Sequence, residues 1–208
     1  MDYYNSMNDL KNLFIKFINK VPSFGKSFIC IDNKNNKDLL KKIKIKNFYT
    51  YGINSKSQFR IKNIKQMKEL SEYDLAINLP GKKNIVINKI KIPLLGVHNI
   101  LNATAAIAVA LTIGISQNAI KSGLKEFRGV QRRFNKIFTH KETSFYDDYA
   151  HHPTEIKEVL NGVRAAYGKE EIICIFQPHR ISRLKDLKKE FSLSFKKADT
   201  VILCPVYA

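Results

Sequence analysis

The chain has 208 residues, enough for one large domain or two small ones with a substantial buried core. Apolar residues at 44% and charged residues at 26% are ordinary for a soluble globular protein, and neither a membrane-spanning apolar run nor a signal peptide is present in these residues. The net charge of +18 leaves two interpretations open, a nucleic-acid-binding module or solvated lysine-rich faces, and the scatter of the 29 lysines along the chain favours the second.

The first part of the chain is predicted to mix helices with short strands. Apolar residues at helical spacing indicate a first helix that Pro22 ends, Gly114 ends an alanine-rich helix, and Ser116 is the N-cap of the next helix. The expected elements are a helix over 7–21, a strand over 26–32, a helix over 36–43, a strand over 47–53, small antiparallel strands over 58–94, and helices over 98–114 and 116–127.

After Gly129 the pattern changes to strands alternating with helices. The expected elements are strands over 135–140 and 144–148, a helix over 153–168, a buried strand over 171–177, an amphipathic helix over 182–198 and a buried strand over 200–204. This order predicts one parallel sheet, with right-handed crossovers, that contains the strands near 145, 174 and 202. We place a domain boundary near Val130, so the expected domains are 1–129 and 130–208.

The positions of the cysteines indicate a cellular compartment, and those of the arginines indicate where anions bind. Cys30, Cys174 and Cys204 are far apart and lie in apolar runs, so we expect buried thiols in a reducing cytosol, hence a cytoplasmic protein. Six of the seven arginines follow residue 127. Because arginine suits bidentate contacts with carboxylates and phosphates, anion binding is expected in this part of the chain.

The segment DDYAHHP gathers titratable side chains at a strand-to-helix turn, with Asp148 after an apolar strand and Pro153 opening a helix. In open α/β sheets, ligands bind beyond the carboxyl ends of strands, beside helix N-termini that attract anions. Simple capping by Asp148 and His152 is one alternative, and a metal site is another. We favour a ligand-binding turn, because capping explains only one or two of the polar residues.

The segment FQPHRISR repeats this arrangement after the next strand, and Ser182 is expected to cap the helix that follows it. Neighbouring parallel strands lie about 4.8 Å apart, so the two turns are expected to share one ligand. His179, Arg180 and Arg183 suit a carboxylate or a phosphate, and a solvated basic helix start is the alternative.

The segment GVHNILN places His98, Asn99 and Asn102 in the first turn of the alanine-rich helix. Asn99 and Asn102 are three residues apart and so share one face of the helix. An asparagine amide offers both a donor and an acceptor, as the edge of a purine requires. Asn99 as a plain N-cap is the alternative.

Taken together, LLGVHNILNATAAIAVA, FRGVQRRF, FYDDYAHHPTEI and FQPHRISR resemble the Mur ligases, which are ATP-dependent amide-bond-forming enzymes of peptidoglycan synthesis. The order and spacing of these motifs match the family over essentially the whole chain. The double histidine narrows the resemblance to the members that add L-alanine and to a ligase that recycles murein tripeptide. FQPHRISR then favours the alanine-adding members.

The resemblance implies a fold, a reaction and residue roles. The fold would be α/β: a remnant of the central ATP-binding domain, then an incomplete Rossmann-like parallel C-terminal domain. The reaction would join L-alanine to UDP-N-acetylmuramate through an acyl phosphate, and it would use ATP and Mg²⁺. It would take place in the cytoplasm and serve cell-wall biogenesis, cell shape and cell division. No nucleic-acid or membrane partner is expected. The implied ATP-binding residues are Asn99, Asn102, Arg133 and Asp148. Arg132 is a less favoured candidate than Arg133 for the contact with the ATP phosphates, and His98 would support the asparagine turn. The implied substrate-binding residues are Tyr149, His179, Arg180 and Arg183, the implied catalytic residues are His151, His152 and Arg180, and no metal ligand is assigned.

The chain also departs from the family pattern. A UDP-sugar-binding domain and a P-loop are missing; GKS at 25–27 lacks the required glycine, because Lys20 stands there. The family also has a magnesium-associated histidine just before the segment that matches residues 1–4, and an aromatic residue often stands where this chain has Ile181. We therefore expect a fragment that is inactive alone.

Overall fold

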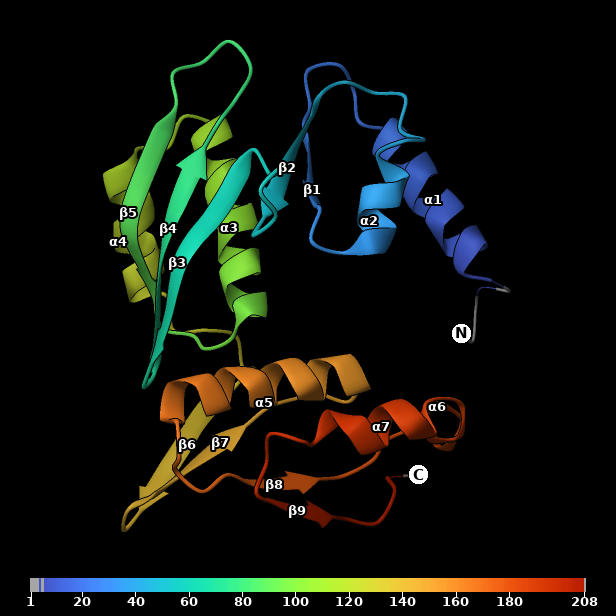
Figure 1. The fold of residues 1–208 in the computed structure, drawn as a ribbon, viewed down its shortest axis with the longest axis vertical. Coiled ribbons are helices and arrows are strands. Elements are labelled where there is room, and N and C mark those ends of the chain that lie inside the picture. Colours follow the sequence, from blue (N-terminus) through green and yellow to red (C-terminus); the bar gives the residue numbers. More distant parts are fainter. Residues whose placement is uncertain (1–3, 5, 208) are drawn as a thin grey trace. The chain divides into compact units, whose positions relative to one another are not determined.

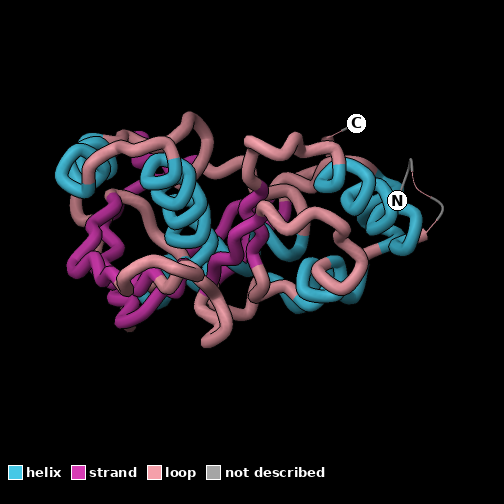
Figure 2. The backbone as a smooth tube through the Cα atoms, turned by 90° about the horizontal axis from the view of Figure 1, so that it is seen from above, coloured by secondary structure: helices cyan, strands magenta, loops and turns pink. Residues whose placement is uncertain are grey.

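The structure is a computed structural model that describes residue 4 and residues 6–207. Figure 1 shows a mixed α/β protein, and Figure 2 shows its helices and strands separated by loops. The chain divides into two compact units, each built from several segments. The first unit comprises Met1–Ile64, Tyr73–Ile90 and Leu101–Lys121, and the second comprises Lys65–Glu72, Lys91–Ile100 and Ser122–Ala208.

The largest sheet has five strands in sequence order: β1 (Ser27–Cys30), β2 (Phe48–Gly52), β3 (Phe59–Met67), β4 (Leu70–Ile77) and β5 (Ile85–Ile92). β1 pairs with β2, and β2 with β3, in parallel. The connections from β3 to β4 and from β4 to β5 are too short for a parallel crossover, so these neighbours are antiparallel, as predicted. Phe59, Ile61, Tyr73 and Leu75 of this sheet are almost completely buried.

The helices around this sheet are α1 (Met7–Asn19), α2 (Lys34–Leu39), α3 (Val97–Thr112) and α4 (Gln117–Glu126). The backbone amide of Ala119 donates to the Ser116 hydroxyl at 3.3 Å, which confirms the predicted N-cap of α4. Ile100, Thr104 and Ile107 are buried at three- and four-residue spacing, so they form the inner face of α3.

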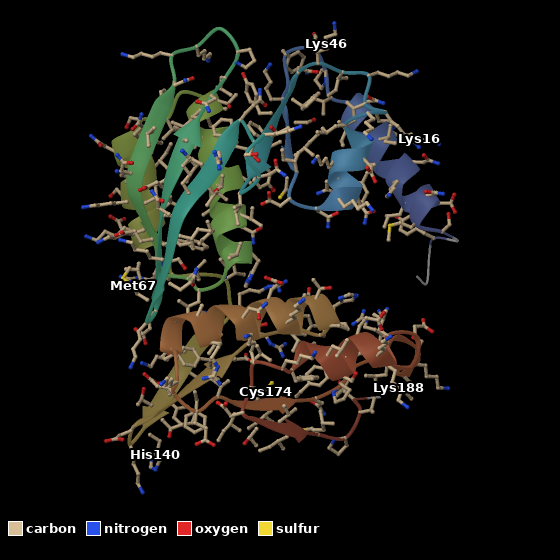
Figure 3. The ribbon with its side chains drawn as sticks, in the orientation of Figure 1. Lys16, Lys46, Met67, His140, Cys174 and Lys188 are labelled. Carbon is tan, nitrogen blue, oxygen red and sulfur yellow. The ribbon has the colours of Figure 1, made fainter. Side chains whose placement is uncertain are left out.

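The remaining elements, all in the second unit, are β6 (Asn135–His140), β7 (Thr143–Asp147), α5 (Pro153–Tyr167), β8 (Ile173–Phe176), α6 (Ile181–Asp186), α7 (Lys188–Ser194) and β9 (Thr200–Leu203). α5 and α7 cover one face of β8. The buried core there consists of Ile156, Leu160, Ile172, Phe176 and Phe191. Figure 3 labels Cys174 of β8, which packs against this core, and His140 at the tip of the β6–β7 hairpin.

The predicted three-stranded parallel sheet is wrong in one strand. β8 and β9 do pair in parallel, with Cys174 opposite Val201. β7, however, pairs antiparallel with β6 as a separate hairpin, with Phe138 opposite Phe145. The two-residue turn between them, where Lys141 adopts a positive φ of 51°, returns the chain directly, so β6 rather than β8 supplies the hydrogen-bond partners of β7.

The single amphipathic helix predicted over 182–198 is also wrong. The chain forms two short helices, α6 and α7, that are separated at Leu187, whose φ of −118° and ψ of 27° are not helical. Ser182 does not cap α6: the N-cap position is Arg180, and no side chain bonds the free amides there.

The strands expected to be buried are only partly so. Side chains alternate across a strand, so Cys174 and Phe176 of β8 face the helices, whereas Ile173 and Ile175 are 53% and 65% exposed. All four residues of β9 are exposed. The three cysteines are free thiols and half-buried, not fully buried as expected.

Candidate active site

Asp148 stands directly after β7 and organises the turn that follows. Its Oδ1 accepts a hydrogen bond from the Ala150 amide at 2.7 Å, and its Oδ2 accepts one from the Phe134 amide at 2.8 Å. Burial raises the pKa of this carboxyl above its ordinary value, although the two amides and the charges of Arg133 and His98 act in the opposite direction. The carboxylate therefore ties the DDYAHHP turn to the loop before β6.

His152 is the N-cap residue of α5. Its Nδ1 accepts a hydrogen bond from the Thr154 amide at 3.3 Å, while Glu155 accepts from the backbone amides of His151 and His152 at 3.0 and 3.2 Å. This is a capping box, with Pro153 in the first turn as predicted. Burial acts to raise the pKa of Glu155, but the amide donors and neighbouring cations outweigh it and the net pKa is lowered. Asp148 and His152 therefore do cap this turn, as the capping alternative predicted. Capping gives no role, however, to the side chains of His151 and Tyr149.

His151 lies between two neighbours in this turn. Its Nδ1 is 2.8 Å from the Tyr149 carbonyl oxygen, and its ring lies 4.9 Å from the Tyr149 ring. The guanidinium of Arg132 covers the Tyr149 ring at 4.7 Å, and the Tyr149 amide donates to the Arg132 carbonyl at 2.8 Å. Arg183 Nη1 donates to the His151 carbonyl at 3.4 Å. The DDYAHHP and FQPHRISR turns therefore touch, although β7 and β8 belong to different sheets.

His179 and Arg180 are the other site residues of the second turn. The His179 ring stacks on Tyr207, with the ring centres 5.6 Å apart. Arg180 is exposed and has a φ of 67°, in the left-handed region that residues other than glycine seldom adopt. Such backbone conformations are concentrated at functional sites.

The asparagine turn at the start of α3 has a defined geometry. The Asn99 side-chain amide donates to the Leu95 carbonyl at 2.7 Å. α3 begins at Val97, so Asn99 lies inside the first turn and is not its N-cap. Asn102 is exposed one turn later. Burial lowers the pKa of His98, and its Nδ1 has no hydrogen-bond partner among the described residues. The charges of Glu158, Asp148 and Arg133 act on His98, so His98 and the Asp148 turn are neighbours within the second unit, to which Asn99 also belongs and Asn102 does not.

Two residues and one contact of this region were missed from the sequence. Glu155 was detectable, because it stands three residues after an N-cap candidate. Gly162 interrupts a predicted helix, and a Cβ there would lie 2.7 Å from the Gly96 Cα, so this glycine permits close packing of α5. The stacking of Arg132 on Tyr149 has no sequence signal.

No group of three or more His, Cys, Asp or Glu side chains that could hold a metal is found among residue 4 and residues 6–207. In the same residues, no helix is long and apolar enough to cross a membrane.

Comparison with known families decides the relationship. The family model described as the Mur ligase middle domain matches residues 1–110, and that described as the Mur ligase, glutamate ligase domain matches residues 132–207. The chain belongs to the Mur ligase family. The predicted family and the α/β fold class are therefore confirmed.

The chain is similar in sequence and in structure to individual Mur ligases. It is 83% identical over 207 residues to the UDP-N-acetylmuramate–L-alanine ligase of Pelagibacter ubique and 41% identical over 210 residues to that of Brachyspira hyodysenteriae; both matches cover all of this chain but only 45% and 44% of the relatives. The crystal structure of the UDP-N-acetylmuramate–alanine ligase of Thermotoga maritima aligns with a TM-score of 0.75 at 28% identity, over 99% of this chain and 43% of that one. The chain thus spans less than half of the relatives that it matches.

Proposed function

We propose that the 208 residues form part of a cytoplasmic ligase that joins L-alanine to UDP-N-acetylmuramate with hydrolysis of ATP to ADP and phosphate. The observation that carries this proposal is the 83% identity, over the whole chain, to a ligase of that name. We place the end of the central domain at residue 129 and the C-terminal domain over 130–208. The Tyr149–His152 turn and the turn at 179–183, in contact through Arg183 and His151, support the choice of an amide-forming site.

The ATP-binding residues form the first half of the proposal. Asn99 and Asn102 would bind the adenine edge, Asp148 the ribose, and Arg133 the phosphates. Their support is chemical: amides pair with a purine edge, a carboxylate accepts from ribose hydroxyls, and a guanidinium matches phosphate oxygens. Asp148 already uses both oxygens on backbone amides, and each oxygen keeps a second lone pair for a ribose hydroxyl.

The remaining residues form the amide-forming half. A carboxylate oxygen of UDP-N-acetylmuramate attacks the γ-phosphorus of ATP, ADP leaves, and an acyl phosphate results. The alanine nitrogen then attacks the acyl carbon, phosphate leaves with the bonding electrons, and the nitrogen loses a proton. Tyr149, His179, Arg180 and Arg183 would hold the carboxylate and phosphate groups, and His151, His152 and Arg180 would act on the reacting atoms. Fixed cationic and N–H groups stabilise the charge that develops in such steps. Mg²⁺ would offset the charge on the phosphate groups, and we assign it no ligand among these residues.

A chimera tests the proposal: residues 1–208 replace the matching segment of the Pelagibacter ubique ligase, and alanine-dependent phosphate release is measured. We expect turnover that requires ATP, L-alanine and UDP-N-acetylmuramate together. In this chimera, Arg180→Ala should impair the use of alanine more than that of ATP, and Asp148→Ala should raise the KM for ATP first. A chimera that folds but does not respond to alanine, or an Arg180→Ala variant with unchanged alanine kinetics, would overturn the assignment.

A further inference from the structure

The surroundings of His151 determine which ring nitrogen carries the proton. Nδ1 lies 2.8 Å from the carbonyl oxygen of Tyr149 and 3.7 Å from Oε2 of Glu155. A carbonyl oxygen and a carboxylate oxygen only accept hydrogen bonds. Nδ1 must therefore carry the hydrogen, and in the neutral ring Nε2 holds the free lone pair.

The surroundings of His152 require the opposite arrangement. Its Nδ1 is 3.3 Å from the backbone nitrogen of Thr154, which only donates. Nδ1 of His152 must therefore be the acceptor, so the neutral ring carries its hydrogen on Nε2. Two histidines that are adjacent in the sequence are thus held in opposite tautomers, one with an acceptor and the other with a donor at Nε2.

Two residues hold this arrangement in place. Glu155 accepts hydrogen bonds from the backbone amides of both histidines, which orients their backbone at the start of α5. Arg132 holds Tyr149 from two sides, because its carbonyl accepts the Tyr149 amide and its guanidinium covers the Tyr149 ring. Arg132 Nε also lies 3.6 Å from Asp147 Oδ2. Since the Tyr149 carbonyl sets the His151 tautomer, Arg132 acts on His151 through Tyr149.

We propose that the two histidines divide the work of amide formation, an inference that rests on the proposed function. Nε2 of His151 takes the proton from the alanine nitrogen as the C–N bond forms and the bond to phosphate breaks. The protonated ring keeps its Nδ1–H on the Tyr149 carbonyl, with the Glu155 carboxylate nearby. Nε2–H of His152 donates to the oxygen on which negative charge develops. Arg132 is a positioning residue, whose stacking on Tyr149 keeps the free nitrogen of His151 directed at the amine.

The tautomers are measurable in the 208-residue chain without any turnover. Two-bond ¹H–¹⁵N spectra of the labelled chain are recorded at a pH above which the ring signals no longer change, and His151→Gln and His152→Gln assign the signals. We expect the Nδ1–H form for His151 and the Nε2–H form for His152. Arg132→Ala should move His151 towards the Nε2–H form that free imidazole side chains prefer in water, and the control Arg132→Lys should retain most of the Nδ1–H form. The same tautomer in both histidines, or an Arg132→Ala spectrum unchanged at His151, would overturn the inference.

Kinetics of the chimera separate this inference from the proposed function. His151→Gln should lower kcat about a hundred-fold, as expected for loss of a proton acceptor. His152→Gln retains an N–H donor in its side-chain amide and should lower kcat less, provided that thermal melting shows the helix cap intact. A chimera that ligates alanine but loses equal activity in both variants refutes the division of work alone. A chimera that folds but does not use alanine refutes the proposed function and leaves the measured tautomers standing.

Discussion

Arg164 offers the sharpest test of how α5 is held in place. Its guanidinium donates to the carbonyls of Gly168 and Glu170, both at 2.8 Å, and twice to the carbonyl of Lys197, at 3.1 and 3.2 Å. It also pairs with the Asp199 carboxylate at 2.5 Å. The side chain is only 22% exposed. One arginine thus fixes the end of α5 to the loop after it and to the segment before β9.

The cost of Arg164→Ala follows from these five contacts. At about 0.5–1 kcal/mol each, they amount to about 3–4 kcal/mol. Releasing the arginine side chain returns about 1–2 kcal/mol of rotamer entropy. The net loss in the free energy of unfolding should be about 2 kcal/mol, a change of about thirty-fold in the unfolding equilibrium. Arg164→Lys keeps the charge but not the planar fork, so it should recover less than half of the loss.

Urea unfolding of the 208-residue chain, followed by far-ultraviolet circular dichroism, measures this cost. Lys197→Ala is the matched control, because it removes a charge from the same loop but keeps the carbonyl that Arg164 bonds; it should change the unfolding free energy by less than about 0.5 kcal/mol. The reasoning is refuted if Arg164→Ala lies within that range, or if Lys197→Ala is equally destabilising.

Three further predictions concern packing, pH and charge. Gly162→Ala should lower the melting temperature, since the contact with Gly96 costs about 1–3 kcal/mol against about 1 kcal/mol of gained helix propensity; a higher melting temperature would contradict the close approach. The pKa of Asp199 is lowered by the Ile172 amide and then by Arg164, so its contribution to stability is present above the ordinary carboxyl pKa and is lost as the pH falls through the folded value. Asp199→Asn should therefore flatten the acid side of the stability profile, and an unchanged profile would count against it. Filter binding at two salt concentrations should show no retention of nucleic acid at physiological salt, whereas tight, steeply salt-dependent retention would favour a nucleic-acid-binding module.

Local patterns in the sequence predicted the helices well. The spacing of apolar residues marks α1, the alanine-rich run and Gly114 mark α3, and Pro153 and Gly168 mark the two ends of α5. These signals act within a few residues, so a sequence reading detects them. The break at Leu187 left no such signal, because the residues around it suit one continuous amphipathic helix.

Features that depend on distant partners were not predictable in the same way. The same run of apolar residues suits a strand that is buried on one face and a strand that is buried on both. The exposure of Ile175 in β8 could therefore not be predicted from the sequence of the strand. The pairing of β7 with β6 depended on a Lys141–Glu142 turn without the usual glycine or asparagine. At the site, motifs pointed to Asp148 and the two histidines, whereas the cover that Arg132 places over Tyr149 depends on a positive φ of 58° at Arg132. The roles assigned to these residues remain predictions.

The most direct test of the central claim is product formation by the chimera that carries residues 1–208. Labelled L-alanine is incubated with the chimera, ATP and UDP-N-acetylmuramate, and the sugar nucleotide is analysed by mass spectrometry. The account predicts ATP-dependent formation of UDP-N-acetylmuramoyl-L-alanine, with no such product from the 208-residue chain alone, because these residues contain no P-loop. A folded chimera that adds a different amino acid, or that releases phosphate without linking alanine, would contradict it.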